Sequence, residues 1–324
     1  MASIKEVAQK ARVSASTVSR VLNYPDLVKP VTRESVFSAI AQLNYSPTSK
    51  RNRRNNIIGL AVSDIKIPLV GKMMLEIEEE LKETPYDLLI FNMNTKKEIH
   101  KFFRKKLGYR KKFDGLIVFS ADLDRESLDF FHSLDIPVVL LQNRCQGEKS
   151  ISTNNYQGAF DAVNFLIGKD YNNIAFIGWE PEDAHLIDRF HGYKNAIEKG
   201  GLPFNERCTA FSFLSTKGGY LATRKLFNSC RPDAIFYASD SLAFGGYQYF
   251  GEKGITVPGD IGIVGFDDLE MASVFALTTM DQFVRVKARM AVSYLIDRLS
   301  GKLLNPLDEE IWISPKLVIR GSTR

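Results

Sequence analysis

Short apolar runs recur through most of the chain and alternate with longer amphipathic stretches. The runs lie at residues 57–62, 88–91, 115–119, 138–141, 174–177, 234–237 and 261–264. Strands that are apolar on both faces and alternate with helices are typical of parallel sheets covered by helices on both sides. The two groups of runs predict two doubly wound, Rossmann-like α/β subdomains, and small molecules bind at the strand ends in such folds.

The amino-terminal segment differs from this body in charge. Residues 1–56 contain ten Lys/Arg and three Asp/Glu, a balance of +7, whereas residues 57–324 contain 33 and 35, a balance of −2. All of the excess positive charge therefore lies on the first sixth of the chain. A small basic module on a nearly neutral body is typical of nucleic-acid binding.

The same segment has the pattern of three short helices. A first helix over residues 4–11 and a second over 15–22 are separated by a short break, and Ser14 stands at the N-cap of the second. Pro30 is well placed in the first turn of a third helix. The predicted inward positions are Ile4, Val7, Ala8, Ala11, Val18, Val21, Leu22, Val36, Ile40 and Leu43. Two helices joined by a tight turn and braced by a third indicate a helix-turn-helix domain.

The outer side of the second helix carries the predicted DNA contacts. Small residues at its start let the backbone approach the floor of the major groove, and Arg20 can reach a guanine O6/N7 edge. The predicted phosphate contacts are Ser14, Thr17, Asn23 and Thr32.

Several local sequences strengthen this interpretation. Ser3-Ile4-Lys5-Glu6-Val7-Ala8, Thr17-Val18-Ser19-Arg20-Val21-Leu22-Asn23 and Tyr45-x-Pro47 closely resemble the headpiece of the LacI/GalR repressor family. The resemblance implies that residues 15–22 enter the major groove, with Ala15, Ser16 and Arg20 reading bases. It also implies a homodimer on a pseudo-palindromic double-stranded operator. Arg12 departs from the family, which usually has a turn glycine there.

Residues 47–56 form a short polar linker between this domain, residues 1–46, and the core at 57–324. No apolar residue lies between Pro47 and Ile57, so the leucine wedge of the family's hinge helix is missing. The segment is either a solvated tether or a basic arm that meets phosphates or a narrow minor groove. The candidate contacts of such an arm are Lys50, Arg51, Arg53 and Arg54.

The body resembles the same family and, through it, the periplasmic sugar-binding fold. The matching segments include Arg189-Phe190-His191-Gly192-Tyr193, Ala238-Ser239-Asp240 and Gly265-Phe266-Asp267-Asp268. The resemblance implies one subdomain at about 57–156 with 283–310, and another at about 157–282 with 311–324. It implies that Arg189 and Asp240 bind a sugar-like effector, joined by Asn143. Asp64 and Ser120 follow strand ends on the same rim and are further candidates. The resemblance also implies a dimer interface along 70–82, 242–250 and 277–286. Asp267 and Asp268 are interpreted as turn residues.

Several classes of protein are not expected. No nucleophile elbow or phosphate-binding loop is present, and the histidines and cysteines show no ligand spacing, so neither an enzyme nor a metal or other cofactor is predicted. Cys145, Cys208 and Cys230 are expected to be reduced thiols in a cytoplasmic protein. No apolar run suits secretion or a membrane span. The sequence predicts an effector-controlled transcriptional repressor; the alternative is a stand-alone sugar-binding protein. The basic stretch 96–112 is either a solvated helix face or a patch for a partner protein.

Overall fold

The structure is a computed structural model of the 324-residue chain. It describes residues 3–23, 28–43, 45, 55–93, 103, 112–120, 125–143, 145, 148–303 and 310–324. The chain folds into two compact units. Unit 1 comprises Met1–Ser63, Leu81–Lys149 and Ser293–Asp308, and unit 2 comprises Asp64–Glu80, Ser150–Val292 and Glu309–Arg324.

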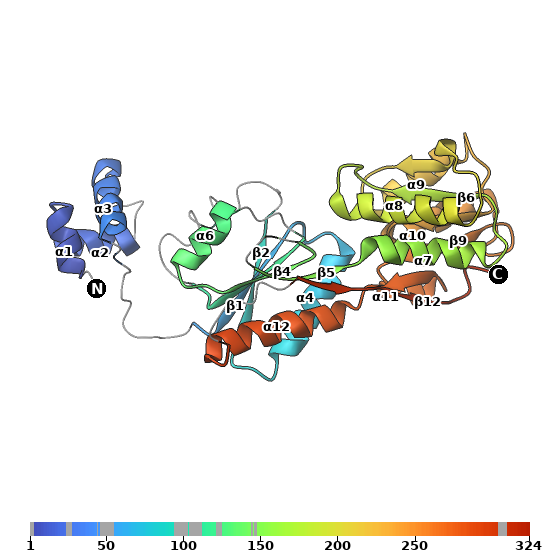
Figure 1. The fold of residues 1–324 in the computed structure, drawn as a ribbon. Helices are drawn as coiled ribbons and strands as arrows, with labels where there is room; N and C mark the ends of the chain where they lie inside the picture. Colours follow the sequence, from blue (N-terminus) through green and yellow to red (C-terminus); the bar gives the residue numbers. More distant parts are fainter. Residues whose placement is uncertain are drawn as a thin grey trace. The chain divides into compact units, whose positions relative to one another are not determined.

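Three helices at the start of the chain pack around one small apolar core (Figure 1). They are α1 (Ile4–Lys10), α2 (Ala15–Asn23) and α3 (Pro30–Gln42). A capping box begins α1, because the Ser3 hydroxyl accepts from the Glu6 amide and the Glu6 carboxylate accepts from the Ser3 amide. The predicted inward positions are all in this core, with Ile4, Ile40 and Leu43 only partly buried.

The strands of the core form two six-stranded sheets. In unit 1 the strands are β1 (Ile57–Val62), β2 (Asp87–Asn92), β3 (Gly115–Phe119) and β4 (Val138–Leu141), and α6 (Arg125–Ser133) precedes β4. These four strands run parallel in the order β4-β3-β1-β2. The Asp114 carboxylate accepts from the amides of Asn55 and Ile57, which fixes the start of β1 directly after the linker.

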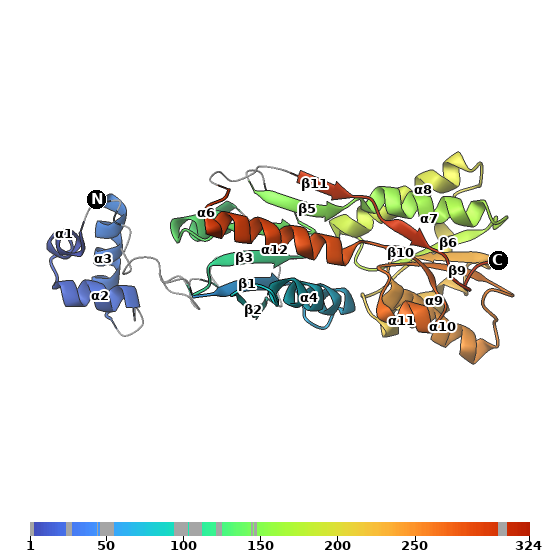
Figure 2. The same cartoon turned by 90° about the horizontal axis from the view of Figure 1, so that it is seen from below.

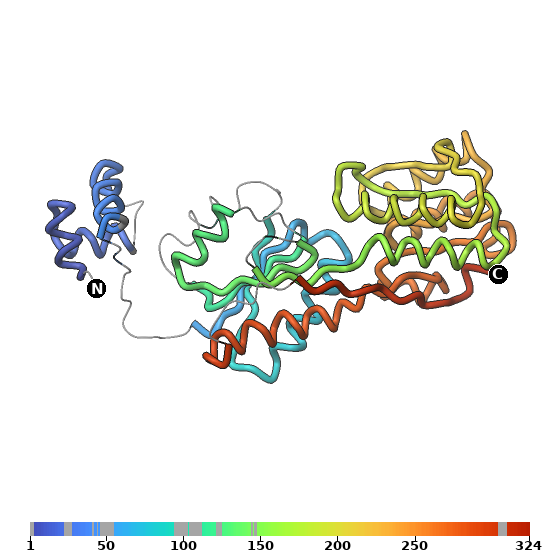
Figure 3. Tube along the Cα trace, viewed as in Figure 1, coloured from blue at the N-terminus to red at the C-terminus, as the bar shows by residue number. Residues whose placement is uncertain are grey.

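Unit 2 contains the second sheet, in the order β12-β10-β9-β8-β6-β7. Its strands are β6 (Ile174–Gly178), β7 (Thr209–Phe211), β8 (Ala234–Tyr237), β9 (Gly262–Phe266), β10 (Thr278–Asp281) and β12 (Lys316–Val318). Only the pairing of β10 with β12 is antiparallel, and Figure 3 traces the carboxyl-terminal segment along that edge. Most of β5 (Lys149–Thr153) also belongs to unit 2, where it pairs in parallel with β11 (Glu310–Ile313).

Helices cover both faces of this second sheet (Figure 2). α7 (Asn155–Ile167) and α8 (Ala184–Lys199) lie side by side on one face, and α9 (Thr216–Leu226) and α10 (Asp240–Lys253) on the other. The remaining elements are α4 (Pro68–Leu81), the 3₁₀ turn η2 (Glu206–Cys208), α11 (Glu270–Val274) and α12 (Val284–Ser300). α9 and α10 can approach closely because Gly219 has no side chain. A Cβ there would lie 2.0 Å from the carbonyl oxygen of Leu242.

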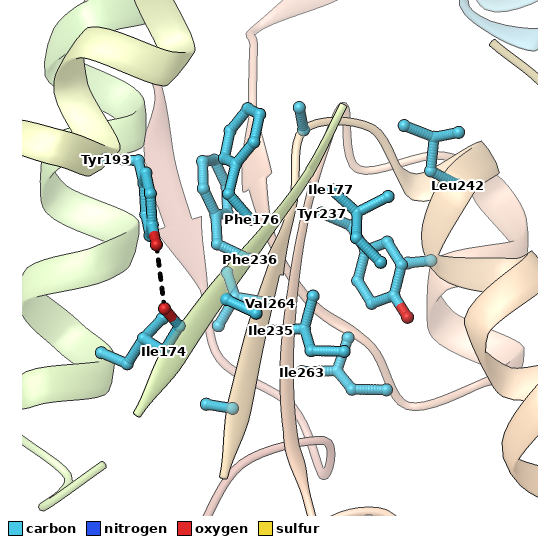
Figure 4. Packing of buried hydrophobic residues seen from close by; sticks show 14 of the residues in the cluster. Ile174, Phe176, Ile177, Tyr193, Ile235, Phe236, Tyr237, Leu242, Ile263 and Val264 are labelled. Atoms are coloured by element: carbon cyan, nitrogen blue, oxygen red, sulfur yellow. Dashed lines mark hydrogen bonds between the residues drawn. The ribbon is translucent and has the colours of Figure 1, made fainter. Parts of the chain in front are cut away.

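The central strands of unit 2 are buried on both faces, as the sequence predicts (Figure 4). Phe176 packs edge-to-face against Phe236, with ring centroids 5.8 Å apart. The buried Tyr193 hydroxyl donates to the carbonyl oxygen of Ile174 at 2.9 Å, so it has a partner within the core. This core holds the strand ends in place at the edge where the candidate site lies.

The expectation of three reduced cysteines is wrong for two of them. Cys208 and Cys230 form a disulfide across 22 residues, and both are buried. Sequence spacing did not reveal the pair, because η2 and the segment after α9 come together only in the folded unit. Cys145 forms no disulfide with a described residue.

Two predictions fall on residues that the structure does not describe. Lys50, Arg51, Arg53 and Arg54 of the basic linker lie outside the described residues, as does most of the basic stretch 96–112. Among the described helices, none is both long and apolar enough to cross a membrane.

Candidate DNA-binding helix and effector site

Ser14 caps the start of α2, as the sequence predicts. Its hydroxyl oxygen accepts from the Thr17 amide at 3.0 Å and lies 2.8 Å from the Thr17 hydroxyl. The preceding turn places Arg12 at φ +55°, in the left-handed region that favours glycine. Arg12 therefore adopts the backbone of a turn glycine at some cost in strain.

The side of α2 opposite its core is polar and open. Ala15, Ser16 and Arg20 are exposed, whereas Val18 between them is fully buried. Thr17 and Thr32 are half-buried, and Asn23 is the last residue of α2. The predicted base-reading residues thus occupy one exposed face of a helix whose other face fixes it to α1 and α3.

A buried polar cluster lies at the carboxyl ends of the strands of unit 2. Parallel strands bring these ends to one edge of the sheet, which is where α/β folds bind ligands. The cluster is formed by seven buried residues, Thr153, Asn155, Arg189, Ser239, Asp267, Gln282 and Lys287. Each follows or ends a strand or lies in the first turns of a helix.

Arg189, on α8, is the centre of the cluster. Its Nε donates to Asn155 Oδ1 at 2.8 Å, and its Nη1 donates to the carbonyl oxygen of Ala238 and lies 3.5 Å from Asp267 Oδ1. The guanidinium carbon lies 3.7 Å from the centre of the Phe266 ring. Its Nη2 has no hydrogen-bond partner among the described residues. One edge of a fixed guanidinium is therefore left to bind an acceptor.

Asp267 is the carboxylate partner of Arg189. Ser239 donates to its Oδ2 at 2.7 Å, and the Gln282 amide donates to its Oδ1. Burial raises the pKa of Asp267, while Arg189 and these two donors act in the opposite direction. The interpretation of Asp267 as a turn residue did not predict its contact with Arg189. The signal available was its position one residue after a buried strand.

Asp240, at the start of α10, is fully buried and is occupied inside unit 2. Its Oδ1 accepts from the Thr279 hydroxyl at 2.5 Å and its Oδ2 accepts from the Leu269 amide at 2.8 Å. Burial raises the pKa of Asp240 well above its ordinary value, and the nearby Asp267 raises it further. Its predicted contact with an effector stays a prediction.

The sequence did not single out two lysines here, Lys287 within the cluster and Lys72 beside it. Lys287 is fully buried, and its ammonium donates to Thr153 Oγ1 at 2.6 Å. Lys72, on α4, donates to the main-chain oxygen of Asp268 at 2.6 Å and lies 3.5 Å from that of Asp267. Sequence periodicity does not separate such lysines from surface residues, because a lysine counts as a polar residue whether it is buried or exposed.

The backbone around these groups is unusual. Asp267 has φ +121°, Asp268 +48° and Phe283 +53°, all outside the regions that L-residues prefer. Backbone strain of this kind persists where surrounding contacts impose it, and it concentrates at ligand sites.

The other predicted effector residues are more loosely placed. The Asp64 carboxylate accepts from the Lys66 amide at 3.0 Å, which closes a turn after β1. Ser120 and Asn143 follow β3 and β4, which are neighbours, and the Ser120 amide donates to the carbonyl oxygen of Leu141 at 3.1 Å. Both are half-buried at one edge of the unit 1 sheet. Within the described residues, no group of three acidic, histidine or cysteine side chains could hold a metal ion.

Comparison with known proteins agrees with both parts of this description. A family model described as bacterial regulatory proteins, lacI family, matches residues 3–48, and one described as a periplasmic binding protein-like domain matches residues 163–323. The HTH-type transcriptional repressor PurR of Histophilus somni (strain 129Pt) is 31% identical over 334 residues, covering 100% of this chain and 99% of that protein. The HTH-type transcriptional regulator RegA of Clostridium saccharobutylicum is 31% identical over 337 residues, covering 99% of each.

Solved structures show the same architecture. The transcriptional regulator CelR in its cellobiose complex superposes with a TM-score of 0.72 at 25% identity, covering 99% of this chain and 100% of that one. A LacI family regulator from Enterococcus faecium with bound ribose superposes with a TM-score of 0.73 at 24% identity, covering 82% and 98%. The predicted fold class, a helix-turn-helix domain followed by a core of two parallel-dominated α/β sheets, is confirmed.

Proposed function

The chain belongs to the lacI family of bacterial regulatory proteins, and we propose that it is a cytoplasmic homodimeric repressor whose operator affinity depends on a small sugar-like effector. It is a DNA-binding transcriptional regulator with an effector domain. No catalytic activity is proposed, since the relatives at about 30% identity are named as regulators.

The exposed face of α2 supports operator recognition. Ala15 and Ser16 let the helix approach the groove floor, and Arg20 can bind a guanine edge with two hydrogen bonds. In the proposal Ser14, Thr17, Asn23 and Thr32 bind phosphates and set the position of the helix. Lys50, Arg51, Arg53 and Arg54 add phosphate contacts from the linker, which makes binding strongly salt-dependent.

The arrangement of Arg189 is the observation that carries the effector proposal. Asn155, the Ala238 carbonyl and Asp267 fix its guanidinium, and Nη2 is left for a ligand oxygen. The solved relatives that bind cellobiose and ribose support a sugar-like effector, and the relatives named PurR keep a purine among the candidates. Asp267 joins Arg189 in this proposal; Asn143, Asp64, Ser120 and Asp240 remain weaker candidates.

Exposed apolar side chains support the homodimer. Leu75 on α4 is 70% exposed and lies in the expected interface segment 70–82. Val286 on α12 is 44% exposed and is the last residue of the expected segment 277–286. Val274 and Phe275, which lie in the sequence between the expected interface segments 242–250 and 277–286, are also exposed. Apolar side chains on several expected interface segments favour a partner surface over solvent. Leu75→Glu should convert the dimer to a monomer in sedimentation equilibrium.

The central experiment compares the full chain with a variant lacking residues 1–46. The full chain should retard one pseudo-palindromic operator fragment selected from random DNA, and the truncated variant should not. Thermal-shift screening of the full chain against sugars, sugar phosphates and nucleobases then identifies the effector, because a ligand of the folded state raises the melting temperature. The absence of specific retardation, both without ligand and with each compound that raises the melting temperature, would refute the regulator and favour a stand-alone binding protein.

A further inference from the structure

Lys287 is a buried lysine with no ion-pair partner among the described residues. It lies in the first turns of α12, and its side chain is fully buried. Its ammonium donates to Thr153 Oγ1 at 2.6 Å and lies 3.5 Å from Gln282 Oε1, both of which are uncharged. It forms no ion pair with any carboxylate in the described part of the chain. A buried ammonium ion is unfavourable unless a negative charge compensates it.

Both cations and carboxylates lie around Lys287. Arg189 and Lys72 are both close enough to repel it, and among the described residues Lys72 is bound only to main-chain oxygens. The nearest carboxylates are Asp267 and Asp281, which attract it from the ends of β9 and β10. Asp267 is already shared among Arg189, Ser239 and Gln282.

Two other acidic groups add little negative charge to this set. The buried Asp240 has a raised pKa, which favours its neutral form, and Asp268 is paired with Arg320 at 2.7 Å. The Asp281 carboxylate accepts from the Phe283 amide at 2.8 Å. Counting Lys287 itself, three cationic side chains therefore adjoin two carboxylates, Asp267 and Asp281, and the Nη2 of Arg189 has no hydrogen-bond partner among the described residues.

We propose that the effector carries an anionic oxygen group, a carboxylate or a phosphate, that is bound by Arg189 and Lys72 and compensates the charge of Lys287. The inference rests on the proposed effector-controlled regulator and adds the chemical class of its ligand. Arg189 contacts the oxyanion through Nη2, because its other nitrogens are engaged. Lys287 acts through Gln282, which bridges it to Asp267, and is thus a positioning residue.

A proton should enter the site with the anion. Burial lowers the pKa of Lys287 to about 7, with Arg189 and Lys72 acting in the same direction and Asp267 and Asp281 opposing them. An added anion favours the charged ammonium and raises this pKa. Above about pH 7 the affinity for an anionic ligand should then fall by up to about tenfold per pH unit. The affinity for a neutral ligand should not follow this profile.

The test compares a neutral sugar with related compounds that carry a carboxylate or a phosphate. Melting temperatures of the full chain are measured with inorganic phosphate alone and with glucose, gluconate and glucose 6-phosphate at constant ionic strength. The proteins are the wild type, Lys287→Met, Lys72→Met and the exposed control Lys316→Met. At least one anion should shift the wild type and Lys316→Met more than it shifts Lys287→Met and Lys72→Met. Gluconate and glucose 6-phosphate distinguish a carboxylate from a phosphate.

Two outcomes overturn the proposal. In the first, glucose shifts the wild type as much as its charged counterparts do. In the second, no anion shifts the wild type more than Lys287→Met. Because phosphate also binds basic DNA-binding surfaces, the comparison between variants and not the shift itself decides. Calorimetry with the responding anion should show proton uptake that Lys287→Met lacks. Specific operator retardation by the wild type, without ligand or with a compound that raises its melting temperature, tests the proposed function separately, so the two failures are distinguishable.

Discussion

Replacing Lys287 with methionine should stabilise the chain at mildly acidic pH. The drop in the pKa of Lys287 from 10.5 to about 7 corresponds to roughly 5 kcal/mol against the charged form. Loss of the hydrogen bond to Thr153 offsets about 1 kcal/mol of the gain. Thr153 still donates to Gln282 at 2.9 Å, so no buried hydroxyl loses its last partner. We expect a net gain of about 2–4 kcal/mol at about pH 6, since methionine has a similar shape and no charge.

The advantage should disappear as the pH rises. The pKa of Lys287 is lower in the folded chain than in the unfolded chain, so between about pH 7 and about pH 10 the unfolded chain binds more protons. The free energy of unfolding of the wild type therefore gains a contribution that rises with pH over this window. Lys287→Met lacks the titrating group and should show a flatter profile.

Urea unfolding of the full chain at about pH 6 and about pH 9 measures the effect, with the transition of unit 2 followed by the fluorescence of its two tryptophans, Trp179 and Trp312. Lys316→Met is the matched control, because Lys316 is exposed and its removal should leave the pH profile unchanged. Parallel profiles for the wild type and Lys287→Met would refute the reasoning. So would a lower midpoint for Lys287→Met at the acidic pH.

Three further substitutions test other contacts. Arg20→Ala should weaken binding to the selected operator by about 1–3 kcal/mol and non-specific binding less, because Arg20 reads a base edge; equal losses in fluorescence anisotropy on both DNAs would contradict base readout. Arg12→Gly should stabilise the helix-turn-helix domain by up to about 1 kcal/mol, because φ is +55° there; a lower urea midpoint of that domain would count against strain. Gly265→Ala should destabilise unit 2 by about 1–3 kcal/mol, since its methyl would lie 2.2 Å from Asp240 Oδ1; an unchanged midpoint would show that Asp240 can move.

Local sequence determined the DNA-binding domain. Val18, Val21 and Leu22 recur at helical spacing and are buried, and Ser14 caps the helix that they anchor. The apolar runs of the core likewise correspond to strands, because a strand covered on both faces needs continuous apolar residues. Short edge strands such as β11 and β12 were not predicted, since they are largely exposed and lack that pattern.

Only the tertiary structure decided the partners within the effector domain. Arg189 and Asp267 are 78 residues apart in sequence, and they meet because parallel strands bring their carboxyl ends to one edge. Burial of Lys287 and the pairing of Cys208 with Cys230 depend on the same packing. Periodicity reports which face of an element is apolar, but it carries no information on which distant residues share an edge. The sequence therefore determined that this chain reads DNA, and the packing of unit 2 decided which charges surround its ligand.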